Sequence, residues 1–441
     1  MKPGPLLDTK LRAWLAACRD LPLEATDPAY IDLDGLNVRG HQHRRLLLQD
    51  TIEMAGDRST CQLFTGFRGT GKSTELIRLR ESLTARNYIV LLADATKFHA
   101  LSRDLAIEEI LPVIAGAFGS AASDHLGGES VLDAGWWDRF SAFLKKEVNL
   151  EPTMHLGPVE LKAALRGEDA FLTTLRRSMA GRLDALAGQA HTFVAALVQR
   201  LRARAPGALG VVFLFDNLEK LSGPVHQFRD RIESVARVFG DHTRYLRLPG
   251  CHTVNTVPLY LQTIYPEVSE YYDGGRMPVL STVWLTEQDP SRTPHRDGIA
   301  ALRAVLAARI TLGEAFASDD QIERVLLASG GHLRGLLKLV TDLLLRARHV
   351  GVPFTDGDVE AAIQDSFEDR RSAVLADAIS LLDGIRRSFA LDHITGEDVP
   401  RLARYLESNL VLCYRNGGGW YDLHPAIREH VRRLAQEARG A

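Results

Sequence analysis

The chain has 441 residues, of which 45% are hydrophobic and 25% are charged, and its formal net charge is −3. This composition is typical of a globular protein of two or three domains and excludes a largely disordered chain. A net charge so close to zero gives no general attraction to nucleic acid or to anionic membranes, so any such contact needs a local basic patch.

The four cysteines are scattered, with no C-x-x-C pair and no histidine cluster at metal-ligand spacing. This pattern predicts reduced core residues rather than disulfides or a zinc site. The opening MKPGPLLDTK lacks the apolar segment of an export signal, and no run reaches the roughly 18 apolar residues of a membrane-spanning helix. We therefore expect a cytoplasmic protein with no membrane contact.

Residues 1–55 are expected to form a helical N-terminal segment, in which NVRGHQHRRLLLQDTIEMA leads toward the first strand. From CQLFTG onward the pattern changes to strand, glycine loop and helix, followed by the apolar run NYIVLLADA. Continuous apolar runs are typical of strands buried in a parallel sheet. This part of the sequence therefore predicts a βαβ unit.

Residues 100–207 carry helical patterns and predict an insertion between two strands of the sheet. Further strands are expected in LGVVFLFDNLEKL, CHTVNTVPLYL and MPVLSTVWL, and the acidic, proline-rich EQDPSRTPHRD marks a boundary before a helical region. Near the end, two β-prone runs flank Asn416-Gly417-Gly418-Gly419, which indicates a hairpin.

These patterns predict an α/β fold: a P-loop parallel sheet flanked by helices, with a helical insertion, an α-helical lid and a winged-helix-like end. The expected domains are an N-terminal segment at 1–55, a core at 56–290, a lid at 291–365 and the winged-helix-like part at 366–441.

The stretch GFRGTGKST lies between the first strand and the helix that follows it, which is the context a phosphate-binding loop requires. Glycines let the backbone N–H groups turn toward a triphosphate, and the helix N-terminus adds a favourable potential. Lys72 is expected against the β and γ phosphates, Ser73 on Mg²⁺, and Thr74 on the α-phosphate side. The predicted nucleotide-binding residues of the loop are Gly66, Gly69, Thr70, Gly71, Lys72, Ser73 and Thr74.

A second acidic site is needed to hold Mg²⁺ from the other side and to orient a water for attack on the γ phosphate. Asp216 follows the apolar run VVFLF, and Glu219 comes three residues later. Ligands of open α/β sheets gather at that end of the strands. Asp216 is therefore predicted as a metal ligand and Glu219 as the group that polarises the water. In the alternative interpretation, Asp216 only caps the next helix and Glu219 is solvated.

Taken together, GFRGTGKSTEL, the insertion, FLFDNLEKL, HTVNTVP, the helical lid and the winged-helix-like end resemble a bacterial P-loop ATPase of the AAA+ and STAND type. Relatives of that type include origin-recognition ATPases, archaeal-type ATPases and NB-ARC switch proteins. The resemblance covers about residues 35 to 435, with the insertion outside the shared core. It implies binding of ATP and Mg²⁺.

The resemblance also implies roles for single residues. Arg39, in Val38-Arg39-Gly40, stands where such proteins place an adenine-pocket motif, although the commoner order is Gly-Arg. Asn255 or Thr256 matches the polar sensor of the γ phosphate; a plain strand-end turn is the alternative.

Three further positions are implied in the same way. Arg334 resembles the lid arginine that reaches back to the phosphates, and His424 resembles the winged-helix histidine that contacts the nucleotide in the resting form. The alternatives are a solvated helix arginine and a packing histidine. Arg244 and Arg247 stand where AAA+ proteins often keep an arginine finger, or are surface charges; a finger implies a homo-oligomer only if it faces a neighbour.

The main functional hypothesis is an ATP-hydrolysing regulatory switch, slow or stimulated by a partner protein, of a kind that serves bacterial signalling or defence. The insertion at 100–207 is the expected partner surface. The alternative is a DNA-binding initiator or transposition helper that uses its winged helix. Residues 366–441 contain 11 Arg and no Lys against 11 Asp plus Glu, so the excess positive charge expected of a DNA-gripping domain is missing.

Overall fold

The computed structural model describes residues 5–98, 104–127, 136–147, 163–165, 169–220, 228–416 and 418–440. The chain divides into two compact units. The loop unit comprises Met1–Arg44, Gly66–Thr74 and Leu280–Ala441, and the sheet unit comprises Arg45–Thr65 and Glu75–Val279. Each unit is described by itself.

A five-stranded sheet in the order β2-β3-β4-β1-β5 forms the centre of the sheet unit. The pairs β2–β3, β3–β4 and β1–β4 run parallel. The residues of β1, β3 and β4 are all buried, as expected of a parallel sheet covered by helices. The strands are β1 (Cys61–Gly66), β2 (Ile89–Asp94), β3 (Val211–Asp216), β4 (Cys251–Val257) and β5 (Val279–Leu280).

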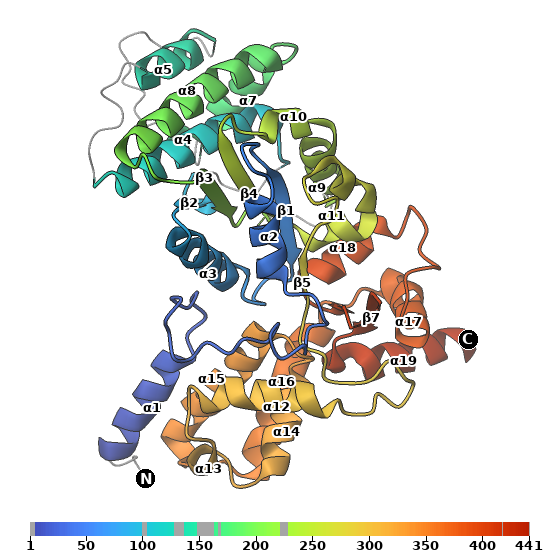
Figure 1. Ribbon diagram of the computed structural model, residues 1–441. Helices are drawn as coiled ribbons and strands as arrows, with labels where there is room; N and C mark the ends of the chain where they lie inside the picture. Colours follow the sequence, from blue (N-terminus) through green and yellow to red (C-terminus); the bar gives the residue numbers. More distant parts are fainter. Residues whose placement is uncertain are drawn as a thin grey trace. The chain divides into compact units, whose positions relative to one another are not determined.

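Helices flank the sheet, and α4 packs along β2 and beside α8 (Figure 1). The described part of the predicted insertion is helical, which confirms that expectation. The helices that lie wholly or mostly in the sheet unit are α2 (Arg44–Glu53), α3 (Lys72–Ala85), α4 (Ile107–His125), α5 (Trp136–Glu147), α7 (Asp169–Met179), α8 (Leu183–Arg204), α9 (Phe228–Ala236), α10 (Thr243–Leu246) and α11 (Leu259–Ile264).

Two predicted strands are shorter than the sequence suggested. β4 ends at Val257 because Pro258 has no N–H for a sheet neighbour, and α11 begins directly after it. β5 contains only Val279 and Leu280. Beyond it the backbone bonds elsewhere: the N–H of Val283 donates to the carbonyl of Gly331, and that of Trp284 donates to the carbonyl of Val38.

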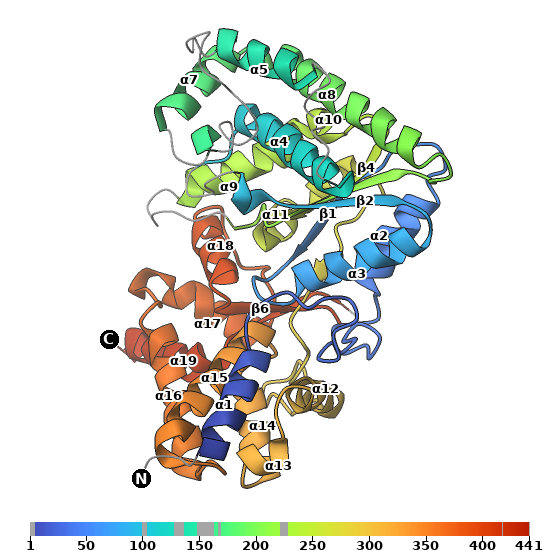
Figure 2. The same cartoon turned by 90° about the vertical axis from the view of Figure 1, so that its left-hand side faces the viewer.

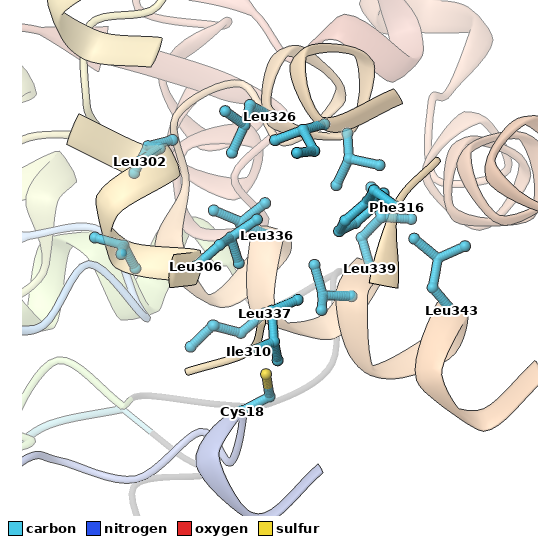
Figure 3. Packing of buried hydrophobic residues seen from close by; sticks show 14 of the residues in the cluster. Cys18, Leu302, Leu306, Ile310, Phe316, Leu326, Leu336, Leu337, Leu339 and Leu343 are labelled. Carbon is cyan, nitrogen blue, oxygen red and sulfur yellow. The ribbon is translucent and has the colours of Figure 1, made fainter. Parts of the chain in front are cut away.

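The loop unit contains a bundle of α-helices packed around a hydrophobic cluster. Helix α1 packs against α15, and Figure 3 shows Cys18, just after α1, pointing toward Ile310 and Leu337. Each fully buried leucine of such a core stabilises the fold by about 2 kcal/mol. The helices are α1 (Pro5–Ala17), α12 (Arg296–Ala307), α13 (Leu312–Ala315), α14 (Asp319–Ala328), α15 (Leu333–Val350) and α16 (Asp356–Arg371).

The C-terminal part of the loop unit has helices followed by a two-stranded antiparallel hairpin, as predicted. Figure 2 shows this region, in which α17 packs against α19 and β7. Phe389, Leu412, Tyr414 and Trp420 form its small core. The elements are α17 (Ile379–Ser388), α18 (Val399–Glu407), β6 (Val411–Tyr414), β7 (Trp420–Leu423) and α19 (Pro425–Gly440).

The predicted fold class is confirmed: a parallel sheet flanked by helices, a helical insertion, a helical bundle and a small C-terminal hairpin. The domain boundaries stay a prediction. Across the described ranges, no helix combines the length and apolar character that crossing a bilayer requires.

Candidate phosphate-binding site

The glycine loop begins where β1 ends and runs into the first turn of α3. Gly69 has a φ of +84°, a left-handed conformation that favours glycine. A Cβ built on it would lie 2.4 Å from the Cβ of Arg334, so a larger residue would also collide with α15. The glycine at this position is therefore required both for the turn and for the close approach of the helix.

Lys72 is buried beneath the loop, with 4% of its surface exposed. Its Nζ donates hydrogen bonds to the carbonyls of Gly66 and Phe67, both at 2.9 Å. Among the described residues, the backbone N–H groups of Gly69, Thr70 and Gly71 donate no hydrogen bond. Three neighbouring N–H groups in a loop that also holds a lysine ammonium are the donors that a phosphate-binding site needs.

Two segments from the N-terminal part of the chain brace the loop. Arg39 is buried, and its Nη2 donates to the carbonyl of Thr70 at 2.7 Å. The N–H of Leu23 donates to Oγ1 of Thr74 at 3.1 Å. Arg39 thus supports the loop from its carbonyl side, while its predicted contact with adenine stays a prediction.

Arg334, at the start of α15, lies directly against the loop. Its backbone N–H donates to the carbonyl of Gly69 at 3.1 Å. Its Nε lies 2.5 Å from Oδ2 of Asp20, at an angle that makes no hydrogen bond. Because the two side chains are 41% and 53% exposed, this pair contributes at most about 1 kcal/mol. The guanidinium can therefore change partners at little cost; its contact with phosphate stays a prediction.

His424 is buried between α16 and the start of α19. Its Nδ1 accepts from the N–H of Ala426 at 3.2 Å, and its ring meets Phe367 edge-on. Burial, with nearby Arg370, holds the pKa of the imidazole well below its usual value, so the ring is neutral. Its Nε2 has no hydrogen-bond partner among the described residues. The predicted nucleotide contact of His424 is untested.

In the sheet unit, Asp216 and Glu219 are both buried. Asp216 ends β3, and its Oδ1 accepts from the N–H of Asn217 at 2.7 Å. Oε2 of Glu219 accepts a 2.8 Å hydrogen bond from the hydroxyl of Thr256. Glu219 is therefore not a solvated surface charge, and Asp216 precedes a turn rather than a helix.

The two candidates for the γ-phosphate sensor, Asn255 and Thr256, are neighbouring residues of β4. Successive side chains of a strand point to opposite faces of the sheet. Thr256 meets Glu219, whereas Nδ2 of Asn255 lies 3.8 Å from Sγ of Cys61. The contacts therefore favour Thr256, the alternative that the sequence left open, as the polar residue beside Glu219.

A third carboxylate lies at the same edge of the sheet. Asp94 ends β2 and is paired in register with Asp216 at the end of β3. Its Oδ1 accepts from the N–H and the hydroxyl of Thr96 at 2.9 and 2.6 Å. Asp94 was not predicted as a site residue, although it follows an apolar run directly, as Asp216 does. Within the described ranges, no group of three or more His, Cys, Asp or Glu residues could hold a metal by itself.

The two arginines considered as fingers lie in exposed ion pairs of the sheet unit. Arg244 pairs with Asp184 and contacts the hydroxyl of Tyr245, and Arg247 pairs with Asp273 at 2.7 Å. A role in a neighbouring molecule stays a prediction for both.

The chain matches no protein-family model and no curated protein. Solved structures resemble it distantly. The ORC2 protein of Aeropyrum pernix, in ADPNP and ADP complexes, is 12% identical, with 96% of this chain and 98% of that one covered and a TM-score of 0.42. A Walker-type ATPase of Pyrococcus abyssi is 14% identical, with coverages of 90% and 96% and a TM-score of 0.39. The ORC1 protein of Aeropyrum pernix, in complex with DNA, is 15% identical, with coverages of 97% and 98% and a TM-score of 0.37. Such distant likenesses assign no role to any residue.

Proposed function

We propose that the protein binds ATP with Mg²⁺ and hydrolyses it. The observation that carries this proposal is the glycine loop, where Lys72 lies among loop carbonyls and the N–H groups of Gly69, Thr70 and Gly71 form no hydrogen bond within the described part of the chain. A triphosphate supplies the oxygen acceptors that these donors and the ammonium suit.

Lys72 would leave the loop carbonyls for the β and γ phosphates. Ser73 and Asp216 would hold Mg²⁺, which neutralises phosphate charge when bound. Glu219 would orient the attacking water and accept its proton. Thr256 supports this role because its hydroxyl holds the Glu219 carboxylate at 2.8 Å. Burial of Glu219 away from solvent keeps the group in one position, which a general base needs.

We assign the output of hydrolysis to a regulatory switch of the AAA+ and STAND type that acts on a partner protein. The weak, exposed pair between Arg334 and Asp20 supports this choice, because a phosphate could replace Asp20 at little cost. A lid helix whose contacts differ between nucleotide states is what a switch requires. The insertion remains the proposed partner surface, and a slow or partner-stimulated rate is expected.

DNA binding is the second candidate, and the likeness to origin-recognition proteins is the reason to test it. The charges of the C-terminal region speak against it. Arg401 of α18 forms ion pairs with Asp377 and Asp398. Asp383 forms ion pairs with Arg386, Arg387 and Arg439. Arginines already paired with carboxylates have less charge to offer to phosphates.

Turnover of ATP by the purified wild type, Lys72→Ala and Glu219→Gln tests the proposal, with and without duplex DNA and with light scattering to follow mass. Lys338→Ala is the matched control, since Lys338 is an exposed lysine of α15. We expect Lys72→Ala to lose binding and turnover, and Glu219→Gln to keep binding but lose about 100-fold in rate. Stimulation by DNA would promote the second candidate. Absence of nucleotide binding by the wild type would refute both.

A further inference from the structure

We propose that His332 is a positioning residue, which orients the glycine loop and fixes Arg334 against it. This inference rests on the proposed function, since it concerns the site that would hold the phosphates. It concerns a residue that nothing in the sequence pattern singled out.

Both ring nitrogens of His332 are used, and the side chain is only 3% exposed. Nδ1 accepts from the N–H of Gly335 at 3.1 Å and so caps the N-terminus of α15. A nitrogen that accepts carries no proton, so the hydrogen of the neutral ring is on Nε2. Nε2 donates to the carbonyl of Arg68, in the glycine loop, at 2.5 Å.

The bond to Arg68 sets the direction of a phosphate donor. In a trans peptide the carbonyl of one residue and the N–H of the next point in opposite directions. Holding the carbonyl of Arg68 on His332 therefore turns the N–H of Gly69 to the other side. That N–H is the first of the three loop N–H groups that form no hydrogen bond in the described structure.

The same contacts fix Arg334, two residues further along. Its N–H bonds to the carbonyl of Gly69 at 3.1 Å, so loop and helix are joined at adjacent loop residues. On the other side of His332, the backbone of Gly331 packs closely on Val283: it accepts a hydrogen bond from the N–H of Val283, and a Cβ there would lie 1.9 Å from the carbonyl oxygen of that residue. A misplacement of about 1 Å can reduce turnover about 100-fold, so this fixation bears on rate as well as on affinity.

A second histidine in the same unit provides a matched control. Nδ1 of His295 accepts from the N–H of Gly298 at 3.2 Å and caps α12 with the same His-x-x-Gly spacing. Its ring stacks on Trp284 at a centroid distance of 3.7 Å instead of reaching the glycine loop. The two histidines thus share the capping position, and His332 alone bonds to Arg68; Nδ1 of His295 also lies 3.2 Å from the carbonyl oxygen of Trp284.

Two substitutions distinguish the capping of α15 by His332 from its hydrogen bond to the carbonyl of Arg68, which we call the tie to the loop. His332→Asn keeps a good capping group, but the shorter side chain does not reach Arg68. His332→Gln is a poorer cap, but its amide N–H extends far enough to donate to that carbonyl. A purely structural cap predicts that Asn is tolerated better than Gln. A tie to the loop predicts the reverse.

The experiment measures the Kd of ATP and kcat for His332→Asn, His332→Gln and His295→Asn. We expect His332→Asn to weaken ATP binding about tenfold and to lower kcat, His332→Gln to restore most of both, and His295→Asn to stay within about twofold of the wild type. Equal effects of His332→Asn and His295→Asn, or better function with Asn than with Gln, would overturn the proposal.

Hydrogen exchange of the nucleotide-free proteins gives a readout that does not depend on ATP. The amide of Arg334, bonded to Gly69, should exchange faster in His332→Asn than in His332→Gln. If the wild type bound no nucleotide, the proposed function would be refuted. The exchange rates of the Arg334 amide in the two His332 variants would still show whether His332 holds the glycine loop. Unchanged exchange in His332→Asn would refute the tie even in a protein that hydrolyses ATP.

Discussion

Acid should destabilise the loop unit through His332. Burial lowers the pKa of its imidazole from the usual 6.5 to about 4. A group whose pKa is lower in the folded than in the unfolded state contributes stability that is complete above pH 6.5 and is lost as the pH falls toward 4. At pH 5 the unfolded histidine is mostly protonated and the folded one is not. The linkage relation then gives a loss of about 2 kcal/mol in the free energy of unfolding relative to pH 7.5.

Urea unfolding of the wild type and of His332→Asn at pH 7.5 and pH 5.0 measures this loss. Of the five tryptophans, Trp14, Trp284 and Trp420 belong to the loop unit, so replacing Trp136 and Trp137 by Phe makes fluorescence report that unit. His424, whose pKa is also lowered by burial, is present in both proteins, so the part of its effect that comes from burial is common to them; the charge of His332 lowers its pKa further in the wild type alone. The stability difference between the two proteins should shrink by about 2 kcal/mol at pH 5. A stability difference that is the same at both pH values would show that His332 does not cause the loss of stability in acid.

Three further outcomes are expected. Thr256→Val removes the hydroxyl that donates to Glu219; kcat should fall about tenfold with the Kd of ATP unchanged, and an unchanged kcat in steady-state assays would contradict the assignment. Asp20→Asn frees Arg334 from a pair worth at most about 1 kcal/mol, so titration should show ATP binding up to about fivefold tighter; weaker binding would show that Asp20 assists the site. Gly331→Ala places a Cβ 1.9 Å from the carbonyl of Val283 at a φ of +82°, and should cost about 2 kcal/mol or more in thermal unfolding. Its control is Gly313→Ala, where a Cβ meets open space; an equal cost for both variants would show that the contact at Val283 is unimportant.

The strand, glycine loop and helix at 61–85 were predictable because apolar runs and glycine spacing are local signals. The hairpin at 411–423 was predictable for the same reason. The short β5 was not, because the backbone partners of the next residues, Gly331 and Val38, are far away in the sequence.

The supports of the candidate site depend on distant partners in the same way. His332 and Arg68 are 264 residues apart, and the sequence around each residue contains no pattern that predicts their hydrogen bond. The choice between Asn255 and Thr256 needed the strand register, which fixes the face on which each side chain points. Local sequence thus predicted the candidate groups of the site, whereas the fold was needed to find the contacts that hold them.

An equilibrium titration of ATP, with Mg²⁺, into the wild type and Lys72→Ala tests most directly whether the glycine loop holds a nucleotide. The wild type should show saturable binding of one ATP per chain. The affinity should be at least about tenfold weaker without the lysine ammonium, the loss expected for one charge-assisted hydrogen bond. Equal affinities for the two proteins, or no binding to the wild type, would contradict the claim that the loop at 66–74 holds the phosphates of a nucleotide.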